Sequence, residues 1–321
     1  MRKSIVFLLL SILIISLCSC ELSMEKPKQG KVHILVYGND YRYMPSGHLN
    51  DTVNDAVQVG MALSKLCEKQ QVSYSAKYIY GMDNSYDAEV SSLPNSEISH
   101  NLTYDYLMES MENLTTGKNA ANEGDLTFIF FSGHGFSDYP DKKYMAEYGA
   151  DISSKGYFLT RKAELSNESI RVQISVLIEK INAIPGAKVV FSDFCFSGAF
   201  VQAGYVSVTG NEYSSMDATD LFGLRSKICE SSSSFYLSAS RYYEKSWEQV
   251  SSVGNHGYFT KALLDAFGWD ESSRTIKTGG AYKDGRITFL DVANYTMNND
   301  NESRQNPMYS GGSNDIILFS F

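Results

Sequence analysis

The stretch VVFSDFCFSG, residues 189–198, organises the interpretation of the whole sequence. It begins as a short apolar run and ends with an acid, a lone thiol and a Ser-Gly turn. An apolar run bounded by a turn is typical of a buried strand, and the carboxyl ends of parallel strands form the sheet edge where ligands bind. Residues 187–191 are therefore predicted to form a strand that presents Cys195 at such an edge.

A second stretch, LTFIFFSGHG at residues 126–135, has the same organisation. Its apolar residues predict a strand over 126–131, which presents His134 in a Ser-Gly-His-Gly turn. A right-handed crossover places consecutive strands of this kind side by side, so the thiol and the imidazole are expected to meet. Each residue alone has a plainer interpretation, since His134 fits a structural turn and Cys195 fits a buried core.

Together the two residues favour nucleophilic catalysis. Cys195 is the candidate nucleophile for an acyl carbon, and His134 is the candidate group that transfers a proton to the leaving amine. The backbone N–H groups of Gly135 and Cys195 are candidates for an oxyanion hole, with Gly135 allowing the backbone to approach the substrate closely. A metal on His134 and Cys195 is disfavoured because no further ligands cluster nearby, and no cofactor is expected.

Composition limits the class of protein. The 321 residues suffice for one large domain or two small ones. The net charge is −9, and no Lys/Arg run occurs beyond the N-terminus, which argues against nucleic acid as a partner. Beyond Cys18 and Cys20, the three cysteines Cys67, Cys195 and Cys229 are too scattered for a disulfide framework.

The N-terminus has the pattern of a targeting segment. Arg2 and Lys3 precede an apolar run that is short for a membrane span and ends in Leu-Cys-Ser-Cys, which resembles a bacterial lipobox. Residues 1–19 are therefore predicted to be a lipoprotein signal peptide, Cys20 the lipidated residue, and residues 20–30 a tether. This places an exported protein in the bacterial cell envelope, anchored to a membrane by lipid. An ordinary secretory signal or an uncleaved anchor remains the alternative.

Residues 31–321 are predicted to form one α/β domain. Strands are expected at residues 31–38, 73–80, 126–131, 156–160, 187–191, 235–239 and 315–321. Helices are expected at 51–68, 102–114, 169–184, 258–267 and 288–297, and loops at 83–99, 136–155, 199–232 and 269–284. The alternation of strands and helices predicts a three-layer α/β/α sandwich with a mostly parallel sheet.

Several segments jointly resemble the caspase/metacaspase family of cysteine peptidases over residues 31–320. They are FFSGHG (130–135), DFCFSG (193–198), LNDTVNDA (49–56), YLSAS (236–240) with SWE (246–248), GYFTKALL (257–264) and QNP (305–307). The resemblance implies the caspase–haemoglobinase fold, with six strands in a mostly parallel sheet, and endopeptidase activity.

The resemblance also implies a substrate pocket. The Gln-Ala-Cys-x-Gly signature of animal caspases is absent, and Asp193 stands where those enzymes carry Gln. Asp193 and Asp55 match the acidic-pocket members of the family, and Ser132 is expected to add a hydroxyl to this S1 pocket. A buried carboxylate pairs with a cationic P1 residue and repels an anionic one, so cleavage after Arg or Lys is expected. For Asp55, the alternative is an acid on the helix surface or a partner of the helix dipole in the first turn.

Other residues receive weaker assignments. Trp247 is a candidate wall of a substrate subsite, or else an exposed structural aromatic residue. Arg225 and Lys227 are candidate self-cleavage sites in the loop after Cys195. Some members of the family need calcium, but Asp138, Asp141 and Asp151 are interpreted as part of a polar loop, and no calcium site is predicted. The remaining histidines, His33, His48, His100 and His256, are interpreted as structural.

A different class of function stays open at this point. The caspase fold would then serve as a catalytically silent binding or assembly module, with the loops 136–155 and 199–232 as its interface. An intact His134–Cys195 pair argues against this alternative, because a binding module does not need both residues. Protein or peptide substrates with a basic P1 residue are therefore the expected partners.

Overall fold

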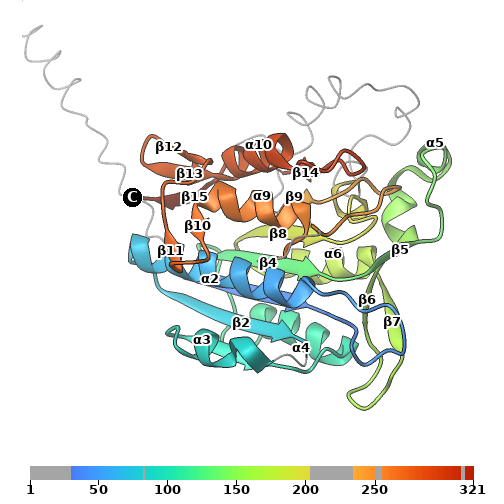
Figure 1. Cartoon of the computed structure of the whole chain (residues 1–321), viewed down its shortest axis with the longest axis horizontal. Coiled ribbons are helices and arrows are strands. Elements are labelled where there is room, and N and C mark those ends of the chain that lie inside the picture. The colour runs from blue at the N-terminus through green and yellow to red at the C-terminus, as the bar shows by residue number, and fades with distance from the viewer. Residues whose placement is uncertain (1–29, 82–83, 203–233, 250–254, 312–314) are drawn as a thin grey trace, which may run out of the picture.

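The computed structural model describes residues 30–81, 84–202, 234–249, 255–311 and 315–321 of the chain. The predicted signal peptide, Cys20, Arg225, Lys227 and Cys229 lie outside these residues. Within them, the central element is a seven-stranded sheet flanked by helices on both faces (Figure 1). The predicted α/β class with a mostly parallel sheet is confirmed.

The strands of this sheet are parallel except for one edge strand. In spatial order they are β14 (Met308–Ser310), β9 (Ser234–Ser238), β8 (Ala187–Asp193), β4 (Leu126–Ser132), β1 (Val32–Gly38), β2 (Tyr74–Tyr80) and β3 (Ser96–Ser99). Only β14 pairs antiparallel to its neighbour. All other strands end at the same edge of the sheet, which is called the carboxyl edge below.

Helices cover the two faces of the sheet (Figure 1). One face carries α2 (Thr52–Gln70), α9 (Tyr258–Phe267) and α10 (Phe289–Asn299), and the other carries α4 (Tyr104–Thr115) and α6 (Ile174–Asn182). The starts of α4 and α10 are fixed by threonine caps. Thr103 accepts a hydrogen bond from the N–H of Tyr106, and Thr288 accepts one from the N–H of Asp291.

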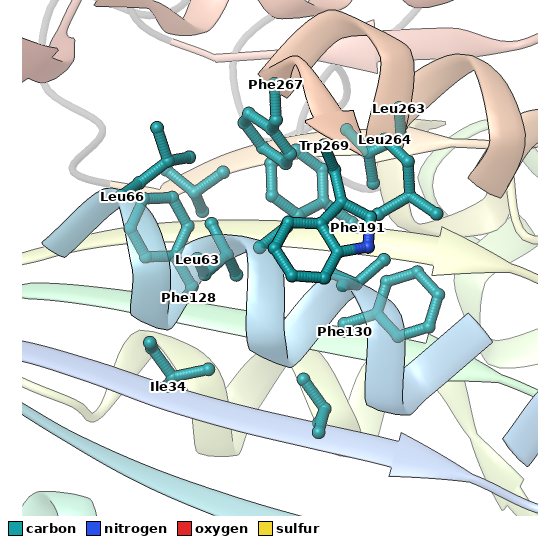
Figure 2. Packing of buried hydrophobic residues seen from close by; sticks show 14 of the residues in the cluster. Ile34, Leu63, Leu66, Phe128, Phe130, Phe191, Leu263, Leu264, Phe267 and Trp269 are labelled. Atoms are coloured by element: carbon teal, nitrogen blue, oxygen red, sulfur yellow. The ribbon is translucent and has the colours of Figure 1, made fainter. Parts of the chain in front are cut away.

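The two hydrophobic cores follow from alternation along the strands. In β4, Phe128 and Phe130 pack with the α2 side, while Ile129 and Phe131 pack with the α4 side. Figure 2 shows Trp269 between the helices α2 and α9, above the sheet residue Phe191. Burial of each such aromatic side chain contributes about 1.5–3 kcal/mol to folding.

Smaller elements surround the sheet. Beside the carboxyl edge, β5 (Gly135–Ser137), β6 (Gly156–Arg161) and β7 (Ser169–Gln173) form an antiparallel sheet, with α5 (Tyr144–Tyr148) and η2 (Gly149–Lys155) inserted after β5. A second small sheet joins β12 (Tyr282–Lys283), β13 (Arg286–Thr288) and β15 (Ile317–Ser320), and β10 (Trp269–Asp270) pairs with β11 (Thr275–Ile276). Two short helices, η1 (Asn84–Tyr86) and α3 (Asp87–Ser91), precede β3.

The structure differs from the predicted elements in several places, and the stretches 83–99, 136–155 and 269–284, predicted as loops, contain short helices and strands. The sheet has seven strands instead of six, because β3 lies in a stretch predicted as loop and the short β14 had no clear pattern. The predicted helix 169–184 begins as strand β7, since Ser169–Gln173 pairs with β6. The C-terminal strand β15 joins β13 and not the central sheet.

Across the described residues, no helix has both the length and the apolar character needed to cross a membrane.

Candidate active site

Strand pairing brings His134 and Cys195 to one place. β4 and β8 are parallel neighbours in a register that aligns Ser132 with Asp193, so His134 and Cys195 both follow two residues later. Both side chains line a cavity of about 120 Å³ at the carboxyl edge of the sheet. The two residues therefore line one cavity at the end of neighbouring strands.

The surroundings of His134 define its orientation. Its backbone N–H donates to the hydroxyl of Tyr41 at 2.8 Å, and its ring lies over the Tyr41 ring with centroids 4.5 Å apart. Nε2 is 2.8 Å from the carbonyl oxygen of Gly47. Because a carbonyl only accepts, Nε2 carries the proton in this hydrogen bond, and in the neutral tautomer the lone pair that can receive a proton is on Nδ1.

Cys195 lies in a strained turn at the end of β8. The next residue, Phe196, has a φ of 64°, a left-handed conformation that costs a residue with a side chain roughly 1 kcal/mol or more. The Phe196 N–H donates to the carbonyl of Glu244 at 2.7 Å, which helps to hold this conformation. The Cys195 Sγ is 3.8 Å from the carbonyl oxygen of Ser246. Burial raises the pKa of the thiol, so a base is needed to generate the thiolate.

Gly135 allows close packing, but against a different group from the one expected. A Cβ at Gly135 would lie 1.8 Å from the carbonyl oxygen of Cys195. The glycine therefore lets the histidine turn and the cysteine turn touch, whereas the sequence suggested an approach to substrate. The Leu159 N–H bonds the carbonyl of His134, and Gly135 pairs with Phe158 in the adjacent position of the ladder. In an antiparallel ladder that position directs the Gly135 N–H away from β6.

The three residues expected in the S1 pocket also line this cavity. Asp193 is 5% exposed, and its Oδ2 accepts hydrogen bonds from the Thr260 hydroxyl (2.7 Å) and N–H (3.2 Å). Asp55 is 1% exposed, and its Oδ2 accepts a hydrogen bond from the Ser132 hydroxyl at 3.1 Å. Burial, and then the charge of Asp55, holds the pKa of Asp193 well above its ordinary value.

Sequence reasoning missed a further acid, Glu248, that lines the cavity. Its Oε1 is buried and has no hydrogen-bond partner among the described residues. Burial and the charges of Asp51 and Asp55 raise the pKa of Glu248 to about 7, and burial together with Asp55 raises that of Asp51 to about 6. The signal was available in the SWE segment, but only Trp247 was considered there.

His256 was interpreted as structural without a partner, and the structure gives it two. Its Nδ1 is 2.8 Å from Asp55 Oδ1, and its Nε2 is 3.1 Å from Glu271 Oε2. Asp55 lies in the first turn of α2, as one alternative had it, but it is a buried, paired acid at the cavity, so the alternative of a helix-surface acid is wrong.

Trp247 lines the cavity, and two neighbouring residues, Arg304 and Gln305, contact it. Its backbone N–H donates to Gln305 Oε1 at 2.7 Å, and the Arg304 guanidinium lies 3.6 Å from its ring centroid. Gln305 in turn donates through Nε2 to Asp300 at 2.6 Å. The QNP segment therefore positions the loop that carries Trp247 and Glu248.

Other candidates lie away from the cavity or have other partners. Asp138 accepts a hydrogen bond from the Tyr157 hydroxyl, and Asp141 accepts one from the Lys143 N–H. No group of three or more potential metal ligands occurs among the residues that the structure describes. Cys67 is buried in the core, where burial raises its pKa to about 12.

The fold and the site define an α/β protein in which two neighbouring strands present a thiol and an imidazole to one acidic cavity. A comparison with family models agrees: the caspase domain matches residues 31–313, so the chain belongs to the caspase-domain family. The match includes His134, Cys195 and every residue that lines the cavity. No curated protein sequence matches the chain significantly.

Proposed function

We propose that this protein is a cysteine endopeptidase in which Cys195 is the nucleophile and His134 the proton carrier. The observation that carries the proposal is that both side chains and three acids, Asp55, Asp193 and Glu248, line the same cavity. His134 Nδ1 takes the thiol proton as Sγ attacks the scissile carbonyl, and it then donates that proton to the leaving amine. Water attacks the resulting thioester and regenerates the thiol.

The N–H groups of Gly135 and Cys195 are the proposed donors to the tetrahedral oxyanion. The Gly135 N–H faces away from β6, and the N–H groups of the two residues after Cys195 are bonded to the carbonyls of Glu244 and Phe194. The close contact between Gly135 and the Cys195 backbone keeps the two donors on neighbouring turns.

The substrate pocket is proposed to select Arg or Lys at P1. Burial and neighbouring acids raise the pKa values of Asp193 and Glu248, and neither carboxyl group is paired with a cation among the described residues. A guanidinium or ammonium group from the substrate supplies that charge and forms charge-assisted hydrogen bonds, whereas an aspartate at P1 adds repulsion.

The remaining predictions concern the parts of the chain outside the described residues. Lipidation of Cys20 would tether the peptidase to a membrane of a bacterial envelope. Self-cleavage after Arg225 or Lys227 fits a basic P1 preference. Mass spectrometry of the purified protein tests both, through the mass of the N-terminal fragment and a cut after one of the two basic residues.

The test of the function is a set of fluorogenic peptides that differ only in having Arg, Lys or Asp at P1. Cleavage of the Arg and Lys peptides, and its loss in Cys195→Ala, is the expected result. Preferred cleavage of the Asp peptide would overturn the pocket assignment. Cys195→Ala activity equal to wild type would overturn the mechanism. Failure of iodoacetamide to label Cys195, with no cleavage of any peptide, would favour the binding-module alternative.

A further inference from the structure

A buried ion-pair chain runs behind the proposed S1 pocket. His256 is 1% exposed and lies between Asp55, which lines the active-site cavity, and Glu271, which lines a separate cavity of about 790 Å³. Each of its ring nitrogens is within hydrogen-bond distance of a carboxylate oxygen. Carboxylates only accept, so both nitrogens donate, and the ring is an imidazolium. The Asn54 Nδ2, which lies 3.3 Å from Nε2 and 3.5 Å from Nδ1, donates instead to the carbonyl oxygen of Asn255 at 3.0 Å.

The charge state is consistent with this geometry. Burial lowers the pKa of His256, but hydrogen bonds to Asp55 and Glu271 more than offset it and raise the pKa to about 9. The charged and titratable groups around His256 and Asp55 are Asp51, Asp193, Glu248, Lys261 and Glu271. Lys261, the one cation among these groups, pairs with Asp265, so within the described residues His256 is the cation that contacts an acid of the active-site cavity.

The segment that begins at His256 also holds the rest of the pocket. The Gly257 N–H lies 3.3 Å from Asp55 Oδ1, and a Cβ at Gly257 would lie 2.0 Å from Asp193 Oδ2. Thr260 binds Asp193 with both its hydroxyl and its N–H. On its other side, the segment bonds the loop that carries Trp247 and Glu248, which is called the substrate loop below. The Gln249 N–H of this loop donates to the carbonyl of His256 at 2.8 Å.

We propose that His256 is a positioning residue for substrate specificity, a built-in cation that orients the Asp55 carboxyl group and offsets the negative charge of a pocket crowded with acids. Without this cation, the acids of the cluster (Asp51, Asp55, Asp193 and Glu248) repel one another uncompensated, and the cluster takes up a proton more readily as the pH falls. A cluster that has gained a proton attracts a cationic P1 side chain less strongly. The inference rests on the proposed function, because it assigns His256 to the S1 pocket of that peptidase.

The first test measures binding without catalysis. Benzamidine, a planar cation that resembles the arginine side chain, is titrated calorimetrically into the full chain and its His256→Gln variant between pH 6 and 8. We expect the ratio of variant to wild-type Kd to grow as the pH falls, to about tenfold at pH 6. His100→Gln is the matched control, because His100 pairs with Asp87 at 3.1 Å and does not line the cavity. It should leave the Kd unchanged.

Two further measurements separate positioning from a general loss of structure. The histidine ring signals in NMR should include one that stays protonated above pH 8, is absent in His256→Gln, and titrates at lower pH in Glu271→Gln. Glu271→Gln spares His256 and its bond to Asp55, and should weaken benzamidine binding in the same direction, but less.

Kinetics distinguish this inference from the proposed function. With Arg-P1 and neutral-P1 peptides, His256→Gln should raise KM for the Arg peptide selectively and change kcat by less than about threefold, since the dyad is untouched. Equal losses on both peptides, a Kd ratio independent of pH, or a His256 signal that titrates near 6.5 would overturn the inference. Wild-type protein that binds benzamidine but cleaves no peptide would overturn the proposed function alone.

Discussion

Two buried histidine–aspartate pairs lie at opposite edges of the same sheet, and their charge states differ. At the amino edge, His33 in β1 pairs with Asp125 at 3.2 Å, and burial lowers the pKa of His33. At the carboxyl edge, His256 pairs with Asp55 at 2.8 Å and is held as a cation with a pKa of about 9. The pairs contain the same residue types, so their surroundings must explain the difference.

The difference lies in what else satisfies the carboxylate. Asp125 accepts hydrogen bonds from the backbone N–H groups of Lys31 (2.8 Å) and Asn122 (2.9 Å), so a neutral His33 suffices. Asp55 is surrounded by further acids, and His256 has a second carboxylate, Glu271, on its other side. The histidine at the amino edge is thus neutral and has a structural role. The carboxyl edge instead concentrates charged groups at a cavity, as expected for a site that binds a charged substrate.

The largest expected effect comes from removing the charge of Asp193 at the carboxyl edge, and the same change at Asp125 on the amino edge is its comparison. Asp193→Asn should lower kcat/KM for an Arg-P1 peptide by about 10²-fold or more, because a buried charged partner of the P1 cation is lost. A peptide with neutral P1 should lose far less. The comparison variant, Asp125→Asn, should keep the Arg preference and lower the free energy of unfolding by roughly 1–3 kcal/mol. Equal losses on both peptides with Asp193→Asn would contradict the assignment of this acid to S1.

The second prediction concerns stability against pH, where the two histidines act with opposite sign. The folded pKa of His256 lies above the unfolded value near 6.5, so its contribution is fully present below pH 6.5 and disappears as the pH rises through about 9. That contribution is roughly 3 kcal/mol. The folded pKa of His33 lies below 6.5, so the folded protein loses stability as the pH falls below 6.5, where the unfolded chain takes up a proton more readily than the folded one.

Denaturant unfolding at pH 5 to 10 measures this contrast. His256→Gln should flatten the decline in stability between pH 6.5 and 9, and His33→Gln should flatten the decline below pH 6.5. Curves that keep their wild-type slope in both variants would show that neither pair controls the pH dependence.

Sequence patterns predicted the placement of His134 and Cys195 at the carboxyl edge better than the charged groups around them. The apolar strands ending in His134 and Cys195 are local signals, and their parallel pairing follows from crossover rules. The pairing of His256 with Asp55 joins residues 201 positions apart, and no local period announces it. Strand β3 was missed for a related reason, since its four residues are only partly buried and depend on β2 for their hydrogen bonds.

A third prediction uses Glu248 to separate substrate charge from dyad chemistry. With a pKa of about 7, Glu248 goes from mostly protonated to mostly ionised between pH 6 and 8, so the ratio of kcat/KM for Arg-P1 over neutral-P1 peptides should rise over this range. The ratio cancels titration of the dyad, which affects both peptides. Glu248→Gln should lower the ratio about tenfold at pH 8 and remove much of its rise. An unchanged pH dependence of the ratio would place Glu248 outside S1.

The smallest expected effect concerns the support of the substrate loop. Gln305 is 4% exposed and connects the backbone of Trp247 to Asp300, so Gln305→Ala removes the acceptor of the Trp247 N–H and loosens the loop that carries Glu248. Loss of one such bond costs about 1 kcal/mol, which corresponds to a several-fold rise in KM with little change in kcat. Gln70→Ala at the amino edge, where the side chain bonds only Ser320 among the described residues, is the matched control. The effect should be small because the stacking of Arg304 on Trp247 still holds the loop in this variant. A fall in kcat that exceeds the rise in KM would show that Gln305 acts on the dyad and not on the substrate loop.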